Sequence, residues 1–294
     1  MKRSKNRFSY DKRIVAFIDI MGMSEHLAAV DKAFTFVKNV SDTINEILRT
    51  EVKLSSTLQH IKLGYDVETF FPGWVGSDVD CRISSISDSI VISVPESTIR
   101  NGERNRLFSL LICLETVFGL QRQLIQLGIL TRGGISFGHL YHANNIVIGD
   151  GLVSAYKLET QAAIFPRVIL DESIQQLMMN ESLRDGIVED LMRLRVGNMF
   201  SRDNDGMYFV DYLGLDIMNR EADWSERFAR IDTFVRDEIS SITDLRVKQK
   251  LFWLQTYIRR SRRTARFDAG PFPHTTKGDL ESKYHRTAPK WMKE

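Results

Sequence analysis

Two acidic residues stand where carboxylates could do metal chemistry. Asp19 closes the apolar run RIVAFIDI and is followed at once by the small-residue turn MGMS, and Asp88 lies at the centre of SISDSIVIS. If these segments are neighbouring strands, both carboxylates reach the same end of one sheet, where two ionised acids repel each other unless a cation lies between them. Because carboxylate oxygens suit Mg²⁺ or Mn²⁺, the pattern predicts a site for divalent metal.

A metal bound there would clamp a triphosphate and lower the pKa of an attacking hydroxyl, as in two-metal phosphoryl chemistry. The turn after Asp19 also opens a predicted helix, whose N-terminal N–H groups can receive phosphate oxygens. Each acid has a purely structural interpretation as well. Asp19 can be a helix N-cap or a solubilising edge residue, and Asp88 an ordinary hairpin-turn acid. The two acids together, in this strand order, favour the metal site.

The elements that carry these acids follow from hydrophobic periodicity. Alternating or continuous apolar runs predict strands and hairpins in four segments: 13–20, 81–95, 130–151 and 167–171. Apolar residues at three- or four-residue steps predict three helices, over about 23–50, 105–129 and 152–163. The order strand, helix, two strands, helix, strands is that of a ferredoxin-like or palm-type α+β core. We expect an antiparallel sheet flanked by helices.

The C-terminal third differs from the rest of the chain in its predicted elements. YFVDYLGLDI, residues 208–217, predicts one more strand, and 223–263 a long charged helix whose apolar face packs on the core. We expect a catalytic region over 1–217, with its core motifs in 13–171, and a helical extension over 218–294. Its basic tail, from Arg259, could contact nucleotide or nucleic acid, although such charge runs usually form solvated faces.

Composition excludes several broad classes of protein. The chain has 294 residues, 43% of them hydrophobic, which is enough for a large core. Because 40 Lys and Arg nearly balance 38 Asp and Glu, no overall field indicates a nucleic-acid or membrane-surface partner. The most apolar segment, 107–120, contains Glu115 and is shorter than the roughly 20 residues that cross a bilayer, so we expect a core helix, with Gly128 as its C-cap. Cys81 and Cys113 lack metal-type spacing and suggest reduced thiols, so we expect a cytoplasmic protein.

Three motifs, in their order and spacing, resemble the catalytic domain of class III nucleotidyl cyclases: FIDIMGMS, SISDSIVIS and TRGGISFGHLYHANNIVIGDGLVSAYKLE. The resemblance covers about residues 13–171. It implies an enzyme that uses two Mg²⁺ or Mn²⁺ ions to convert a nucleoside triphosphate to its 3′,5′-cyclic monophosphate and pyrophosphate. It also implies a homodimer, because the active site of the family lies between two antiparallel catalytic domains.

The resemblance assigns roles to residues, motif by motif. Asp19 and Asp88 fall on the two metal-binding acids, and Ile20 would offer its backbone carbonyl to metal. The positions that match phosphate contacts are Gly22, Met23 and Ser24 in the turn, and His139, which stands where the family has an arginine.

The helix motif departs from the family. Purine cyclases carry an Asn and an Arg there, which orient the ribose and stabilise charge on the transferring phosphate; Val153 and Lys157 stand at these positions. Lys157 supplies a catalytic positive charge without a bidentate fork, and Val153 cannot hydrogen-bond. Tyr141 and Tyr156 are candidates to hold the ribose, although each can also be a packing aromatic. Otherwise the chain is a degenerate, nucleotide-binding regulatory module.

More closely, RGGISxGxLYH, AYxLE and FPRV resemble the stand-alone bacterial pyrimidine cyclases of the Pycsar anti-phage system, whose cyclic nucleotide activates a separately encoded effector. Where purine cyclases read the base with a Lys or Glu and an Asp, this chain has Ser84 and Ile146. Neither offers the paired hydrogen bonds that distinguish adenine from guanine. We expect a smaller base, read by a side chain such as Arg82 or by backbone.

UTP is favoured over CTP because the resemblance points to no acidic residue in this chain that would read cytosine. Ser84 and Ile146 can also be plain strand residues, with a purine contact elsewhere, so a purine cyclase stays an alternative. A two-metal polymerase or nuclease palm is weaker, since a basic channel is missing.

Overall fold

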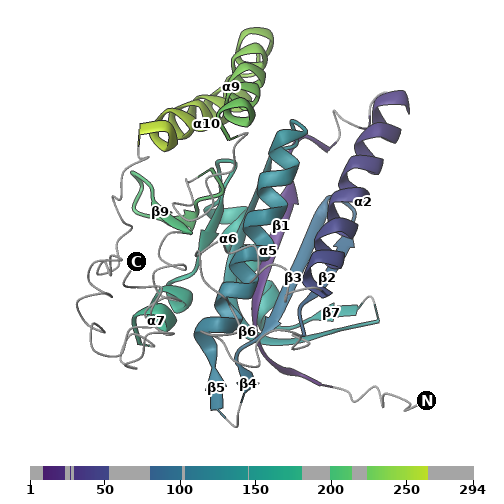
Figure 1. Ribbon diagram of the computed structural model, residues 1–294, viewed down its shortest axis with the longest axis vertical. Coiled ribbons are helices and arrows are strands. Elements are labelled where there is room, and N and C mark those ends of the chain that lie inside the picture. The colour runs from purple at the N-terminus through teal and green to yellow at the C-terminus, as the bar shows by residue number, and fades with distance from the viewer. Residues whose placement is uncertain are drawn as a thin grey trace, which may run out of the picture.

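The computed structural model describes residues 9–23, 27, 30–52, 80–100, 103–144, 146–180, 199–213 and 224–263. They form an α+β fold in which helices flank a mixed eight-stranded sheet (Figure 1). Along the sheet the order is β2-β3-β1-β6-β8-β10-β9, and β7 pairs with β6. The first strands are β1 (Asp11–Ile20), β2 (Arg82–Ile86), β3 (Ser89–Pro95), β6 (Thr131–Ala143) and β7 (Ile146–Ile148). The remaining strands of the sheet are β8 (Val168–Leu170), β9 (Phe200–Arg202) and β10 (Tyr208–Val210).

The helices are α2 (Val30–Val52), α5 (Arg106–Gln126), α6 (Asp150–Gln161), α7 (Glu172–Asn180), α9 (Trp224–Ser241) and α10 (Leu245–Arg263). A short separate ribbon, β4 (Thr98–Arg100) with β5 (Glu103–Asn105), precedes α5. The predicted order of strands and helices up to residue 171 is confirmed.

The first part of the sheet is ferredoxin-like, as predicted. β1 lies between β3 and β6 and is antiparallel to both, and β2 completes the order β2-β3-β1-β6. The expectation of an antiparallel sheet is wrong at one pair, because β8 runs parallel to β6, whereas β8–β10 and β10–β9 are antiparallel. The chain leaves β6 through the β7 hairpin and returns over α6, and a crossover through a helix brings the next strand back in the same direction.

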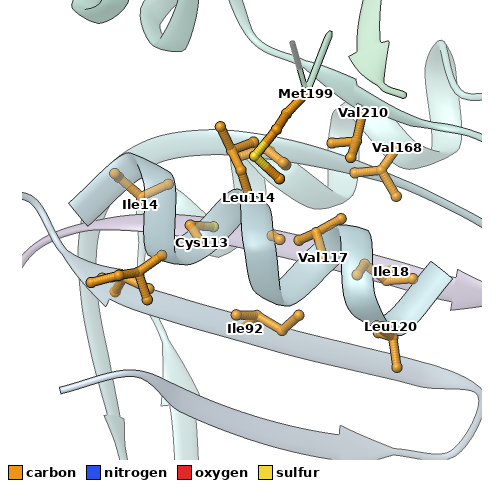
Figure 2. Close-up of a cluster of buried hydrophobic side chains, with 14 of the residues drawn as sticks. Ile14, Ile18, Ile92, Cys113, Leu114, Val117, Leu120, Val168, Met199 and Val210 are labelled. Atoms are coloured by element: carbon orange, nitrogen blue, oxygen red, sulfur yellow. The ribbon is translucent and has the colours of Figure 1, made fainter. Parts of the chain in front are cut away.

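Residue alternation in β1 separates two faces of the sheet. Ile14, Ile18 and their even-numbered neighbours belong to the main core, which Figure 2 shows together with Cys113, Leu114 and Val117 of α5. Val15 and Phe17 face the opposite side, under α6. Asp19 continues this second series, so it lies on the α6 face.

Helix α5 has the length and composition to span a membrane, yet most of it is buried against the sheet and the other helices. It is the predicted core helix. Its end is also as predicted: Gly128 has φ +75°, and the N–H groups of Gly128 and Ile129 donate to the carbonyls of Ile125 and Leu124. The next residue, Leu130, accepts a hydrogen bond from the Met21 N–H (2.9 Å), which ties this turn to the segment after Asp19.

The single long helix expected over 223–263 is wrong, because α9 and α10 are two helices. Asp244 is the cause: its side chain accepts the N–H groups of Arg246 (2.7 Å) and Val247 (3.4 Å) and so starts a new helix. The predicted strand over 208–217 is limited to β10 in the described chain, and 214–217, the linker 53–79 and the basic tail after Arg263 lie outside the described residues.

Helix α10 contributes Leu254 and Ile258 to a second core cluster with Ile169 and Phe209 of the sheet, and α9 contributes Val235 to it. In Figure 1 the two helices lie beyond the end of α5. The boundary at residue 217 stays a prediction.

Candidate active site

The strand register places Asp19 and Asp88 side by side. Asp19 pairs with Ser89, and the Ile20 N–H donates to the backbone carbonyl of Asp88 (2.8 Å). Asp88 occupies the turn between β2 and β3, where Ser87 before it has φ +57°. Two adjacent antiparallel strands therefore carry the two acids to the same end of the sheet.

Arg132 of β6 contributes a cation that sequence reasoning missed. Its Nε donates to Asp19 Oδ2 (3.1 Å), and its Nη2 lies 2.7 Å from Glu159 Oε1 of α6. Glu159 is only 3% exposed, so the arginine bridges a half-buried acid and a buried one. Arg132 and Glu159 stand inside two of the motifs quoted above, but only the β1–β6 register and the packing of α6 bring them together.

Electrostatics tie these groups into one cluster. Burial raises the pKa of the Asp19 carboxyl; Arg132 opposes the shift, the charge of Asp88 adds to it, and Lys250 of α10 opposes it. Burial likewise raises the pKa of Glu159, against the effect of Arg132 and with that of Asp19 and Asp88. Asp19 and Glu159 thus share the positive charge of Arg132, with the charge of Asp88 acting on both acids, an arrangement in which a further cation is favoured.

The donor set fits divalent metal of the kind that keeps water and phosphate ligands. In the described chain no group of three or more His, Cys, Asp and Glu residues could hold a metal by itself. Two carboxylates are nonetheless what Mg²⁺ commonly takes from a protein, with substrate phosphates and water completing its octahedron. The hydrogen bond from Arg132 uses one of the two oxygens of Asp19.

The turn after Asp19 presents backbone more than side chains. Ile20 is 2% exposed, and Met23 packs against the main core. Gly22 has φ +74°, a conformation that glycine adopts without strain. Any contact of Ile20, Gly22 or Met23 with phosphate or metal would therefore come from the main chain; Ser24 lies outside the described residues.

Glycines of β6 let α6 lie directly on this face of the sheet. A Cβ added to Gly134 would be 2.4 Å from the Leu158 Cβ, and one added to Gly138 would be 2.6 Å from the Gly151 nitrogen. The Ser136 hydroxyl also donates to the Gly151 carbonyl (2.8 Å). This close contact is what brings Glu159 to Arg132.

The other candidates on α6, Val153, Tyr156 and Lys157, are exposed. Lys157 is two residues from Glu159 and lies on the opposite side of the helix from it, whereas Tyr156, three residues before Glu159, lies on the same side. The Tyr156 ring packs edge-on against Phe17 (centroids 5.4 Å apart) and stays half exposed.

His139 and Tyr141 lie far from the acids. His139 pairs with Lys12, roughly 24 Å from Asp19 along β1 at about 3.4 Å per residue, and alternation puts it on the other face of β6 from Arg132. Its ring stacks on Tyr10 (5.6 Å), and its Nδ1 lies 3.8 Å from Asp150 Oδ2. Tyr141 pairs with Ile148 in the β6–β7 hairpin.

Ser84 belongs to a second polar cluster, on the same face as Asp19. Its hydroxyl lies 2.8 Å from His142 Nε2, and the Ser93 hydroxyl lies 2.7 Å from His142 Nδ1. Buried Arg13 donates from Nε to the Ser93 hydroxyl (2.9 Å) and pairs with Asp80 (2.8 Å). Burial and the charges of Arg13 and Arg82 lower the pKa of His142 to about 4, so the ring is neutral at pH 7.

The predicted base-reading pair is not assembled within one chain. Ile146 pairs with Ala143, next to the His142–Val147 pair, so it lies on the opposite face of the β6–β7 ribbon from His142 and is 48% exposed. Arg82 is held by Asp80 (2.5 Å) and donates to the His142 carbonyl. Of the predicted base contacts, Ser84 and Arg82 therefore belong to the His142 network and Ile146 does not.

No protein-family model matches this chain, and no curated protein sequence matches it. Among solved structures it is similar to the monomeric guanylyl cyclase domain of the RhoGC fusion protein from the aquatic fungus Blastocladiella emersonii (12% identity, 68% of this chain, 95% of that chain, TM-score 0.35). It is also similar to a bacterial light-regulated adenylyl cyclase (9% identity, 80% of this chain, 60% of that chain, TM-score 0.38). At this distance the chemistry has to be argued from the residues of this chain.

Proposed function

We propose that this protein is a metal-dependent nucleotidyl cyclase that converts UTP to its 3′,5′-cyclic monophosphate and pyrophosphate. The observation that carries the proposal is the adjacent pair Asp19 and Asp88 at one sheet end, beside a glycine turn and an arginine. The sequence motifs around these residues, in cyclase order, support the same reaction. CTP is the second pyrimidine candidate. A purine cyclase or a binding module without turnover are the alternatives.

The roles of the residues follow from their positions. Asp19, Asp88 and the Ile20 carbonyl would hold Mg²⁺ or Mn²⁺, and the bound metal would supply Lewis-acid activation of the phosphates and of the ribose 3′-hydroxyl. Arg132, fixed by Glu159, holds the Asp19 carboxylate in place. In the reaction the 3′-oxygen forms a bond to the α-phosphorus, the bond from that phosphorus to the β-phosphate oxygen breaks, and the hydroxyl proton passes to solvent. The backbone of the Gly22 turn binds phosphate oxygens.

A second copy of the chain completes the site in this proposal. Lys157 is exposed on the side of α6 opposite Glu159, and His139 lies at the far end of β1, so one chain does not bring these two residues to its own acids. In a symmetric antiparallel dimer each copy would offer these residues to the acids of the other, giving two equivalent sites.

Mixing two defective chains tests this assembly. An Asp19→Asn chain and a Lys157→Ala chain, each inactive alone, should regain about a quarter of normal activity, since random pairing makes half of the dimers hybrid and each hybrid has one intact site of two. Mixing Asp19→Asn with Asp88→Asn is the control, because both acids come from the same copy and no intact site forms. Equal recovery in both mixtures, or full activity in a monomer, would contradict the dimeric site.

Substrate preference decides between the candidate functions. The protein is incubated with Mn²⁺ and equal concentrations of ATP, GTP, CTP and UTP, and initial rates of cyclic product are measured by mass spectrometry. We expect UTP to react fastest. A purine preference above tenfold, about 1.4 kcal/mol of transition-state binding, would overturn the pyrimidine proposal. Absence of product from all four would favour the regulatory module.

The biological role proposed for the product is that of a second messenger. The likeness to Pycsar pyrimidine cyclases supports a cytoplasmic anti-phage signal that activates a separately encoded effector.

A further inference from the structure

A hydrogen-bonded chain runs from buried Arg13 to Ser84. Arg13, Ser93 and His142 are each 3% exposed or less, whereas Ser84 is half-buried. Arg13 Nε donates to the Ser93 hydroxyl, which contacts His142 Nδ1, and His142 Nε2 contacts the Ser84 hydroxyl. The chain therefore connects an obligate donor to a hydroxyl at the edge of the polar cluster.

Counting donors and acceptors fixes the direction of every bond. An arginine can only donate, so one lone pair of the Ser93 oxygen accepts its N–H. Within the described part of the chain, His142 Nδ1 is the acceptor available to the Ser93 hydroxyl hydrogen. Were Nδ1 protonated instead, this fully buried hydrogen would have no partner there, which is costly. Nδ1 is thus the acceptor, and the neutral ring carries its proton on Nε2.

The consequence falls on Ser84. Because His142 Nε2–H donates to the Ser84 oxygen, the hydroxyl hydrogen of Ser84 is left to point elsewhere. Ser84 therefore presents a donor to whatever lies beside it. With the other histidine tautomer, Ser84 would give its hydrogen to Nε2 and offer only lone pairs.

Ser84 lies within reach of a nucleotide bound at the acids. Ser84 pairs with Val91, and Val91 pairs with Phe17. Phe17 is two residues before Asp19 on β1, so Ser84 and Asp19 lie on the same face of the sheet. Two strands across, at about 4.8 Å each, and two residues along, at about 3.4 Å each, put Ser84 roughly 12 Å from Asp19. A nucleotide spans such a distance from phosphates to base.

We propose that Ser84 is a specificity-determining residue that donates a hydrogen bond to a base carbonyl, the O4 atom of uracil, and that Arg13, Ser93 and His142 position it as a donor. The proposal rests on the nucleotide cyclase function. A carbonyl accepts this bond, whereas the amino group at the same position of cytosine has only donors to offer and leaves the Ser84 hydrogen unpaired. The same logic favours guanine, with its O6 carbonyl, over adenine.

Kinetics of three serine variants test the assignment. Ser84→Ala should lower the UTP:CTP ratio of kcat/KM about tenfold, the effect of one unmet hydrogen bond. Ser93→Ala should lower the ratio in the same direction, because His142 loses the hydrogen-bond donor that sets its tautomer. Ser93 itself is buried behind His142 and does not face the base. Ser85→Ala, on the exposed other face of β2, is the matched control and should leave the ratio unchanged. An unchanged ratio in Ser84→Ala would overturn the proposal.

Nuclear magnetic resonance of ¹⁵N-histidine-labelled protein tests the tautomer without any turnover. The signals of His142, assigned by their loss in His142→Gln, should show the proton on Nε2 in the wild type. A proton on Nδ1 would overturn the donor assignment. If the protein cyclises no triphosphate, the proposed function fails separately, and the affinities for UTP and CTP measured by calorimetry then decide the role of Ser84: equal affinities overturn it.

Discussion

Asp19→Asn and Asp88→Asn should each lower cyclase turnover by roughly 10³-fold, measured as product formed at saturating UTP and Mn²⁺. Each substitution removes a charged metal ligand at almost unchanged volume, and metal activation contributes several kcal/mol to phosphoryl chemistry, with each 1.4 kcal/mol being tenfold in rate. Asp19 at the end of β1 and Asp88 in the β2–β3 turn lie at one sheet end, and each would supply its own ligand to the metal. Activity within a few-fold of the wild type in either variant would exclude the metal assignment.

The same two variants should differ in stability. From sequence alone, removal of either charge relieves a repulsion and raises the melting temperature in the absence of metal. Asp19, however, accepts a hydrogen bond from Arg132, so Asp19→Asn also weakens an ion pair and should lower the melting temperature slightly. Asp88→Asn removes a charge that disfavours the ionised forms of Asp19 and Glu159. This variant should leave the melting temperature unchanged or raise it. Asp11→Asn, at the exposed start of β1, is the control for both.

Arg167→Met should destabilise the fold by about 3 kcal/mol, the lower end of the usual cost of removing one partner of a buried ion pair, because Asp203 is largely buried whereas Asp205 is 43% exposed. The Arg167 side chain is fully buried and pairs with Asp203 and Asp205. Its guanidinium carbon lies 5.3–5.9 Å from the ring centroids of Phe165, Phe209 and Trp253, and Trp253 Nε1 donates to Asp203 (2.6 Å). Arg167 therefore joins the strand after α6, the β9–β10 hairpin and α10.

Urea denaturation followed by circular dichroism measures this loss. Arg230→Ala is the matched control, because Arg230 forms an exposed i,i+4 pair with Glu226 on α9 and such pairs contribute about 0.5 kcal/mol or less. A loss below about 1 kcal/mol in Arg167→Met would mean that the guanidinium is not required to hold this cluster together. Since Gly133 N–H donates to the Arg167 carbonyl (3.1 Å), a large loss should also disturb the neighbouring Arg132 and reduce activity.

The sequence alone determined the elements whose signals are local. The apolar run before Asp19, the SISDS reversal and Gly128 after α5 predicted a strand, a hairpin and a helix end, because each depends on side-chain period or on the backbone freedom of a few residues. The order of these elements also predicted that Asp19 and Asp88 lie side by side, because a ferredoxin-like sheet leaves few other positions for the two strands. Asp244 is also a local signal, since its side chain starts α10. Because apolar residues recur at helical spacing on both sides of it, one long helix was predicted instead of two.

Only the tertiary structure decided which charges meet and which side chains are hidden. Arg132 reaches both Asp19 and Glu159 because β6 lies beside β1 and because glycines let α6 contact the sheet, and no spacing along the chain encodes that contact. The parallel pairing of β8 likewise depends on the crossover through α6. Ser84 is a plain strand serine in the sequence; its hydrogen bond to His142, a ring buried between strands far apart in the chain, is what makes it a directed donor, because burial forces every polar group to find a partner.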